Sequence, residues 1–404
     1  MAIFGSNSNK SEQHNWAGNL RFTPAEYHVA DGERELISLL KTANQKGKIV
    51  RSVGARHSCS PIIETDDMLL SLEKFNRLHA VDDKHLEATV GAGMTVEEVG
   101  KALFKHHLAM ENTGHIDQQS LAGAICTGTH GAGKGLTNLS GPVAAIKLVT
   151  GTGEPRVYHE NDHPDIMRAL RVSLGALGIF TEITLKVLPA FRLKRQHFCT
   201  SVEDCLKHLP ELMEENRNFG FYWYPRRDEV SLRLWNELGM GTQDLPYARL
   251  DKEEVGWSQD LLPTPHELRY VELEYSLGIE EATDCFMEIR ERILKKHRKE
   301  VGWRLLFRPV AGDDNYLSNA YGRPTVAITI HQNACLPYEA YFKDIEQIFQ
   351  AYDSRPHWGK MHSMTARELK HCYPEWDTFQ RIREEFDPNN ILLTPYLKRI
   401  LIAS

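Results

Sequence analysis

Two short segments of the chain combine glycine with polar side chains. The first is Arg51-Ser-Val-Gly-Ala-Arg-His57-Ser-Cys-Ser60, and the second is Thr127-Gly-Thr-His-Gly-Ala-Gly-Lys-Gly135. Glycine lets the backbone turn sharply and present successive amide hydrogens to an anion. Both segments are therefore candidate loops for binding a pyrophosphate, although either one alone is equally compatible with an ordinary turn.

The better-known nucleotide-binding patterns do not fit these segments. In the second segment, Gly128 is followed after four residues by a Gly-Lys pair, but the next residue is Gly135 where a Ser or Thr would hold magnesium. The Gly-x-Gly pairs at 91–93 and 151–153 lack the third glycine of a dinucleotide-binding turn. The sequence thus argues against a nucleoside triphosphate and against a nicotinamide cofactor.

The composition narrows the class of protein. The chain has 404 residues, of which 41% are hydrophobic and 25% charged, and this predicts a globular protein of two or three domains. A net charge of −7 argues against a general surface for nucleic acid. There is no apolar run long enough for a membrane span, and the polar residues 1–16 do not resemble a signal peptide. We therefore expect a cytoplasmic protein that acts on a small molecule as a monomer or a small homo-oligomer.

The cysteines and most histidines give no sign of a disulfide framework or a metal site. The seven cysteines are odd in number and contain no CxxC pair, which predicts that most are reduced and buried. Apart from the histidines of the motifs discussed below, the histidines, including His106 and His107, lack metal-ligand spacing and are predicted to be surface residues.

The first half of the chain predicts a mixture of helices and strands. Asp31 is expected to cap a helix that Gly47 ends, and Thr95 begins another with a capping box. Alternating residues over 179–188 predict a half-buried strand, and we place a domain boundary at Pro189, which ends it. Further strands are predicted at 48–53, 68–72, 77–81 and 86–91.

The second half follows the same mixed pattern. Ser201 is expected to cap a helix, and residues 236–266 are expected to form a loop because they are rich in Gly, Pro and Asp. Strands are predicted at 219–224, 269–276, 303–309 and 325–331, and helices at 279–297, 337–352 and 375–386.

Several motifs in the same order give the chain a resemblance to a known family. Besides the two glycine segments, these are Gly114-His-Ile-Asp-Gln-Gln-Ser-Leu-Ala-Gly123, Ser173-Leu-Gly-Ala-Leu-Gly-Ile-Phe-Thr-Glu182 and His357-Trp-Gly-Lys360. From about Trp16 to Leu401, the chain resembles the aldonolactone and alditol oxidases of the vanillyl-alcohol-oxidase superfamily of flavoproteins.

The resemblance implies an α+β fold. It implies a PCMH-type FAD-binding domain of two subdomains over 1–190, a cap domain with an antiparallel sheet and helices over 191–361, and a segment over 362–404 that returns to the first domain. The residues implied to contact the FAD are Ser52, Val53, Gly54, Ala55, Arg56, Ser58, Gly114, His115, Ser120, Gly123, Thr127, Gly128, Thr129, His130 and Ile179.

The resemblance also implies a covalent bond between His57 and the 8α-methyl carbon of the flavin. Such a bond requires a neutral imidazole that acts as the nucleophile. The alternative is a histidine that packs beside the ring without a bond. Cys59 is a weaker candidate for a second attachment point, because doubly linked relatives take their cysteine from another part of the chain.

Position 114 bears on the electron acceptor. Relatives that react with oxygen have a glycine here, whereas dehydrogenases of the group have an alanine that blocks the flavin edge. Gly114 therefore favours an oxidase that produces hydrogen peroxide, unless the glycine serves only the backbone conformation.

On the substrate side, the resemblance assigns catalysis to Lys360 and Arg308, since a fixed cation stabilises a developing alkoxide. A surface charge is the alternative for each. The family usually has Glu-x-Arg where this chain has Leu306-Phe-Arg308, so an apolar wall replaces a carboxylate. Thr329 and His331 share a strand face and match substrate-contacting positions, and His331 is a candidate second base or a structural histidine.

These observations predict an FAD-dependent oxidase of a sugar alcohol or an aldonolactone, with oxygen as its acceptor and no metal. One rival is a dehydrogenase of the same fold that uses a quinone or a cytochrome. The other, suggested by Leu306, is a flavin-binding or sugar-binding protein that has lost turnover.

Overall fold

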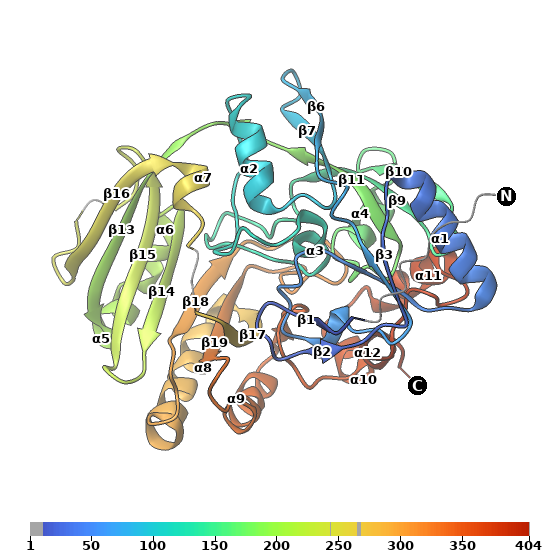
Figure 1. Ribbon diagram of the computed structural model, residues 1–404. Coiled ribbons are helices and arrows are strands. Elements are labelled where there is room, and N and C mark those ends of the chain that lie inside the picture. The colour runs from blue at the N-terminus through green and yellow to red at the C-terminus, as the bar shows by residue number, and fades with distance from the viewer. Residues whose placement is uncertain (1–10, 243, 265–267, 404) are drawn as a thin grey trace.

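The computed structural model describes residues 11–242, 244–264 and 268–403 (Figure 1). Within these residues, the strands before residue 190 form small sheets, whereas the strands after it form one large antiparallel sheet. This arrangement, with helices packed beside the sheets, confirms the predicted α+β fold. The elements of the amino-terminal region are β1 (Gln13–His14), β2 (Arg21–Phe22), β3 (Glu26–Val29), α1 (Glu33–Lys46), β4 (Val50–Val53), β5 (Met68–Ser71), β6 (Leu78–Asp82), β7 (Glu87–Gly91), α2 (Val96–Phe104), β8 (Leu108–Ala109), α3 (Leu121–Cys126), β9 (Val143–Val149), β10 (Pro155–His159), α4 (Pro164–Leu170), β11 (Ile179–Lys186) and β12 (Leu188–Pro189).

A three-stranded parallel sheet, β3-β5-β4, carries the first glycine segment at the end of β4. The helix α1 buries Leu36 and Leu40 beside this sheet and ends at Gly47 in the left-handed conformation, as predicted. The predicted cap at Asp31 is wrong. Gly32 occupies the cap position with φ 96°, a conformation that favours glycine, and the helix therefore begins one residue later.

A five-stranded antiparallel sheet, β10-β9-β11-β7-β6, forms the second part of the amino-terminal region. Its strand β11 confirms the strand predicted over 179–188. Beside it, Thr95 caps α2 through a complete capping box with Glu98, also as predicted. The short helix α3 begins after Ser120 and leads into the second glycine segment.

The large sheet has the strand order β16-β13-β15-β14-β18-β19-β17-β20. Its strands β14, β17, β18 and β19 confirm the four predicted there, and Ser201 caps α5 as expected. The elements are β13 (Arg192–Ser201), α5 (Val202–Lys207), α6 (Leu209–Glu215), β14 (Asn218–Tyr224), β15 (Glu229–Glu237), β16 (Arg249–Trp257), α7 (Ser258–Leu261), β17 (Tyr270–Gly278), α8 (Ile279–Arg292), a π-helical continuation (Ile293–His297), β18 (Leu305–Val310), β19 (Thr325–Asn333), α9 (Glu339–Ala351) and β20 (Arg355–Pro356).

The prediction of a loop over 236–266 is wrong for much of its length. It contains β16 and α7, while residues 243 and 265–267 lie outside the described part of the chain. The strand β16 lies at the edge of the large sheet and is mostly exposed on both faces. Its charged residues therefore show no alternation of apolar and polar types, and it is held as a strand by backbone pairing with β13.

The carboxyl-terminal segment lies against the amino-terminal region, where Figure 1 shows red helices beside the blue ones. It contains α10 (Ala366–Cys372), α11 (Trp376–Phe386) and α12 (Pro395–Leu401). The amide of Val50 donates to the carbonyl oxygen of Ile391 at 2.7 Å, and that of Gly151 donates to Phe386 at 3.0 Å. These bonds attach the end of the chain to β4, which leads into the first glycine segment, and to the turn between β9 and β10.

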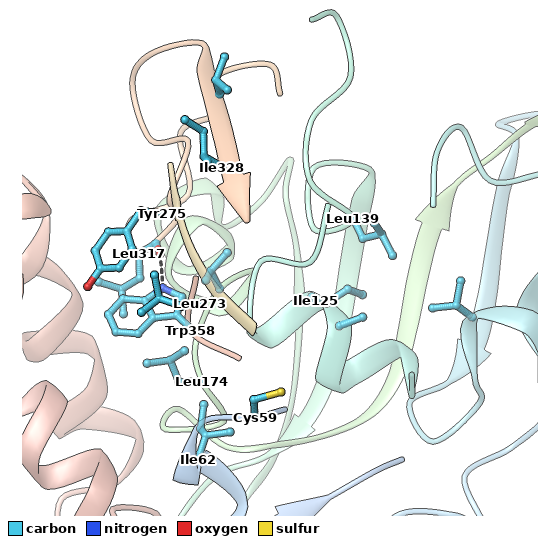
Figure 2. Close-up of a cluster of buried hydrophobic side chains, with 14 of the residues drawn as sticks. Cys59, Ile62, Ile125, Leu139, Leu174, Leu273, Tyr275, Leu317, Ile328 and Trp358 are labelled. Carbon is cyan, nitrogen blue, oxygen red and sulfur yellow. Dashed lines mark hydrogen bonds between the residues drawn. The ribbon is translucent and has the colours of Figure 1, made fainter. Parts of the chain in front are cut away.

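The main hydrophobic core joins the large sheet to the glycine segments (Figure 2). Cys59 lies in the first segment and Ile62 follows it, Ile125 lies on α3, and Tyr275 lies on β17. Trp358 packs within the same cluster, and its indole N–H donates to the carbonyl oxygen of Leu317 at 2.7 Å. The site is therefore built on parts of the protein that share one core.

Two further expectations can be compared with the described residues. All seven cysteines are free thiols, as predicted, but only Cys59, Cys205 and Cys285 are buried, and Cys335 is exposed. Among the described helices, none is long and apolar enough to cross a membrane.

Candidate active site

Two adjoining cavities lie between the glycine segments and the large sheet. The first is bordered by both segments, by residues 174–180 and by the segment 357–360. The second is bordered by Gly114, His115 and residues of β14, β18 and β19. The cavities share Gln119, Thr129, Glu272, His357 and Lys360.

The first cavity is a cradle that depends on glycine. A Cβ on Gly54 would lie 1.8 Å from Ser120 Oγ, and one on Gly123 would lie 2.9 Å from the same atom, so the first segment meets the start of α3 at Ser120. The guanidinium of Arg51 borders the cavity, and its buried Nε has no hydrogen-bond partner among the described residues. A cradle of backbone amides and an unused donor fits the pyrophosphate of a dinucleotide.

Most of the predicted cofactor residues border these cavities. Those on the first cavity are Ser52, Val53, Gly54, Ala55, Arg56, Ser58, Ser120, Gly123, Thr127 and Thr129, and those on the second are Gly114, His115, Thr129 and His130. Gly128 and Ile179 border neither. The Ile179 side chain packs into a core cluster with Leu36, whereas its neighbours Gly178 and Phe180 face the first cavity.

His57 borders the first cavity and is positioned by an aromatic neighbour. Its ring stacks on Trp16, with the ring centroids 5.4 Å apart. Burial lowers the pKa of His57 to about 4, against a smaller opposing effect of Glu272. The imidazole is therefore neutral at pH 7, which is the form that a nucleophile requires.

The carboxylate of Glu274 on β17 is the centre of the polar network. It is fully buried, and it accepts hydrogen bonds from His130 Nε2 at 2.9 Å, from Arg308 Nη2 at 2.8 Å and from Lys360 Nζ at 2.8 Å. The hydroxyl of Thr329 also donates to it. Burial alone would raise the pKa of Glu274, but Lys360, His130 and Arg308 hold it well below its usual value.

Glu272, two residues earlier on the same strand, borders both cavities. Its Oε1 lies 3.0 Å from His331 Nε2 and 3.2 Å from Lys360 Nζ. Burial would raise the pKa of Glu272, but Lys360 and the hydrogen bond from His331 lower it. Lys360 therefore lies between two ionised carboxylates.

Pairing within the large sheet places these side chains on one face. Across the strands, Glu274 is opposite Thr329, Thr329 is opposite Leu306, and Leu306 is opposite Tyr222. Glu272 is opposite His331 in a neighbouring row. Residues two apart on a strand point to the same face, so the pairing brings Arg308 to this face as well.

Backbone pairing also fixes Lys360 and His130. The segment 355–361 runs along β17, where the amide of Met361 donates to the carbonyl oxygen of Glu272 at 2.9 Å. It also contacts the first glycine segment, because the amide of Cys59 donates to Gly359 at 2.8 Å. In the second segment, the amide of Gly133 donates to Pro309 of β18 at 2.8 Å, which brings His130 to Glu274.

Each of the two histidine–carboxylate pairs has oxygen acceptors at both ring nitrogens. His331 Nδ1 lies 2.9 Å from the carbonyl oxygen of Arg304, and His130 Nδ1 lies 2.9 Å from that of Gly131. Each Nε2 faces a carboxylate oxygen, so a protonated ring donates on both sides and shares a proton with the carboxylate, whereas a neutral ring donates on one side only. Burial lowers the pKa of both rings, against the carboxylates, which raise it.

The predicted catalytic and substrate residues have different roles in this geometry. Lys360, Arg308, Leu306 and His331 border the second cavity, with Leu306 as an apolar part of its wall. Thr329 does not border it, because it is fully buried behind Glu274.

The prediction that the other histidines lie at the surface is wrong for three of them. His197, His297 and His362 are all buried. Two have partners far away in the sequence: His297 pairs with Asp344, and His362 Nε2 lies 3.2 Å from the hydroxyl of Tyr396. Spacing along the chain does not reveal such contacts. Burial lowers the pKa of His357, which borders both cavities, to about 3.

Glu272 and Glu274 were not identified from the sequence. The signal was present in Val-Glu-Leu-Glu-Tyr at 271–275, where two carboxylates share one face of an otherwise apolar strand. Such residues need buried partners, and that requirement marks them as candidates.

Three buried groups, His130, Glu274 and His357, have ligand atoms within 4.8 Å of one another, a spacing that a metal ion could use. Lys360 and Arg308 already place two positive charges on Glu274. A further cation would be repelled by both, so we interpret this group as part of the ion-pair network.

Comparison with protein families matches almost the whole chain. Residues 183–251 and 240–400 match the family described as D-arabinono-1,4-lactone oxidase. Residues 24–157 match the family described as FAD binding domain, and this range includes both glycine segments.

Relatives of known function are similar over their full length. An L-gulono-1,4-lactone dehydrogenase of Mycobacterium tuberculosis is 31% identical over 96% of this chain and 98% of its own. An alditol oxidase of Streptomyces is 28% identical over 96% and 98%, and the L-gulonolactone oxidase of Mus musculus is 26% identical over 96% and 97%. Among solved structures, cholesterol oxidase of Brevibacterium sterolicum has the same fold, with a TM-score of 0.82, 17% identity and 96% coverage of each chain.

Replacement of Glu274 by Gln is expected to destabilise the protein by about 3 to 5 kcal/mol, because it leaves Lys360 and Arg308 buried without their shared countercharge. Urea denaturation of the flavin-loaded protein measures this loss. The control is Glu253→Gln on the exposed strand β16, which should cost less than about 1 kcal/mol. Equal losses in the two variants would show that Glu274 is not the centre of the network.

Proposed function

Because the chain belongs to the D-arabinono-1,4-lactone oxidase family and carries an FAD-binding domain, we propose that it oxidises a sugar alcohol or an aldonolactone, with oxygen as the acceptor. The main support is the position of Lys360 and Arg308. Both converge on Glu274 at the wall of the second cavity, and this cavity adjoins the glycine cradle.

The residues of the second cavity can bind and deprotonate a hydroxyl group. When bound, FAD supplies the acceptor for the hydride of the C–H bond. Lys360 and Arg308 supply positive charge where an alkoxide develops, which lowers the pKa of the substrate hydroxyl. His331, which burial favours in its neutral form and which contacts Glu272, is the group best placed to take up the hydroxyl proton and later return it.

Replacement of Lys360 by Ala should slow flavin reduction by at least about 100-fold, because a cation that stabilises the alkoxide is lost. Anaerobic stopped-flow measurement of the flavin absorbance gives this rate directly. The control is Lys370→Ala, which removes an exposed lysine paired with Asp377. An unchanged rate would show that Lys360 is not catalytic. If no polyol or lactone reduces the flavin of the wild-type protein, the result would favour a flavin-binding or sugar-binding protein that has lost turnover.

We also propose that His57 is bonded to the flavin. The support is its position on the first cavity and its neutral ring. An imidazole nitrogen would join the 8α-methyl carbon, with one hydrogen lost from each. The two electrons would pass into the flavin and leave through the same acceptor that serves turnover.

Acid precipitation is expected to leave the yellow colour in the protein pellet, and His57→Ala is expected to release it. His85→Ala, at an exposed histidine, should keep the colour in the pellet. The His57 pKa of about 4 adds a pH test. Attachment to the apoprotein should proceed at a constant rate from about pH 5 to 8, where the ring is neutral, and slow as the pH falls below about 4. Colour in the wild-type supernatant would rule out the bond.

Oxygen as the acceptor is supported by the surroundings of Gly114. Gly114 borders the second cavity, and a Cβ there would lie 3.1 Å from Thr129 Cγ2 and 3.6 Å from the carbonyl oxygen of His130. Its φ lies outside the left-handed region, so the backbone does not require glycine. Because one relative is named a dehydrogenase, a quinone or a cytochrome is the alternative acceptor for this chain.

Gly114→Ala should slow the reaction of the reduced protein with oxygen by at least about tenfold, because the methyl group fills space at the cavity wall. The protein is reduced anaerobically and then mixed with aerated buffer. Gly135→Ala is the matched control, since a Cβ there meets nothing within 4 Å. Slow reoxidation of the wild type would reject the oxidase and favour the dehydrogenase.

A further inference from the structure

A third cavity opens beside the second and has five arginines in its wall. It has a volume of about 800 Å³ and lies over β14, β15 and the turn before β18. We call it the arginine vestibule. Its arginines are Arg226, Arg227, Arg233, Arg249 and Arg304.

The vestibule adjoins the catalytic cavity. Trp303 and Arg304 border both, so these two residues form the boundary between them. Arg304 comes immediately before β18, the strand that carries Leu306 and Arg308 toward the catalytic cavity. By the rise of a strand, about 13 Å separates the Cα atoms of residues 304 and 308. Because the side chains of both arginines line the catalytic cavity, a ligand in that cavity that carries an additional group can contact both.

The wall of the vestibule is positively charged. Five arginines face only two carboxylates among its described lining residues, Glu229 and Asp251, although the whole chain has a net charge of −7. Those carboxylates lie 3.9 Å from Arg227 and 3.6 Å from Arg249. The positive field reaches the neighbouring strand, where burial and then Arg233 lower the pKa of His197 to about 3.

Two of these arginines are held in place at the inner end. The guanidinium carbon of Arg304 lies 4.0 Å from the ring centroid of Tyr222, and that of Arg233 lies 4.9 Å from the same ring. Tyr222 itself borders the catalytic cavity. Stacking on an aromatic ring holds the plane of a guanidinium in a fixed orientation, which favours binding of an anion.

We propose that the arginine vestibule binds an anionic group at the far end of the substrate, so that the preferred substrate is a sugar alcohol or lactone carrying a phosphate or a carboxylate. This rests on the proposed function and specifies its substrate class. The apolar Leu306 between Arg304 and Arg308 is consistent with it, since it places no negative charge beside such a group.

The test compares neutral and anionic members of the same sugar series. Pentitols and hexitols, their terminal phosphates and the corresponding aldonates are each titrated into the flavin-loaded protein by calorimetry and assayed for flavin reduction. We expect kcat/KM to be at least about tenfold higher for one anionic class, through a lower KM, and to fall as salt is added. Phosphate esters and aldonates are measured separately. If the protein prefers the phosphate esters, inorganic phosphate should inhibit competitively.

The arginines are tested by substitution. Arg304→Gln and, separately, Arg233→Gln should abolish the preference for the anionic class, and Arg304→Lys should restore part of it because the charge returns. Arg156→Gln, at an arginine on β10 paired with Glu154, is the control and should keep the preference. A merely structural role for Arg304 would lower the rates with neutral and anionic substrates equally.

The outcomes separate this proposal from the proposed function. The proposal of an anionic substrate is rejected if neutral and anionic compounds bind with equal affinity. It is also rejected if the preference persists in both glutamine variants. In either case the proposed oxidase function is unaffected. Binding of an anionic sugar that depends on Arg304, without any flavin reduction, supports the vestibule and rejects the oxidase.

Discussion

The carboxylate of Glu274 is the interaction on which the site depends. An ionised carboxylate without access to water is very unfavourable unless it is paired and hydrogen-bonded. Its partners come from four separate parts of the chain: the second glycine segment, β18, β19 and the segment after β20. Arg308 and Thr329 stand in the same sheet as Glu274, but His130 can reach it only when that sheet is docked against the second glycine segment. The assembly of the cavity and the satisfaction of this one charge are thus the same event.

The proton count of this network sets the charge of the catalytic cavity. Lys360 and Arg308 contribute two positive charges, and Glu272 and Glu274 contribute two negative ones. If the shared proton is present in both histidine–carboxylate pairs, each pair is neutral, and the cavity keeps two positive charges for a developing oxyanion. If both protons are lost, the cavity becomes neutral. In the proposed reaction, the protonation of the two buried histidines would therefore set the electrostatic potential of the cavity.

The sequence predicted those parts of the structure whose signals are local. Gly47 ending α1 and the capping box at Thr95 follow from short-range rules. The glycine segments were recognisable because a backbone cradle requires glycine. The strand β16 was missed because an exposed edge strand carries no hydrophobic alternation. Glu274 was missed because its role depends on partners up to 144 residues away in the sequence, which only the folded arrangement of the strands brings together.

Leu306 does not deprive the cavity of a carboxylate. The resemblance to the aldonolactone and alditol oxidases led to the expectation of a glutamate at this position, and its absence raised the possibility of lost turnover. The carboxylate of Glu272, two strands away on the same face, borders both cavities and lies 3.2 Å from Lys360 Nζ. A glutamate at 306 would stand in the row of Glu274 and add a third negative charge to a network with two permanent cations. Leucine at 306 therefore adds no further negative charge to the network, and in the proposed reaction the carboxylate available to a substrate hydroxyl would be that of Glu272 on β17.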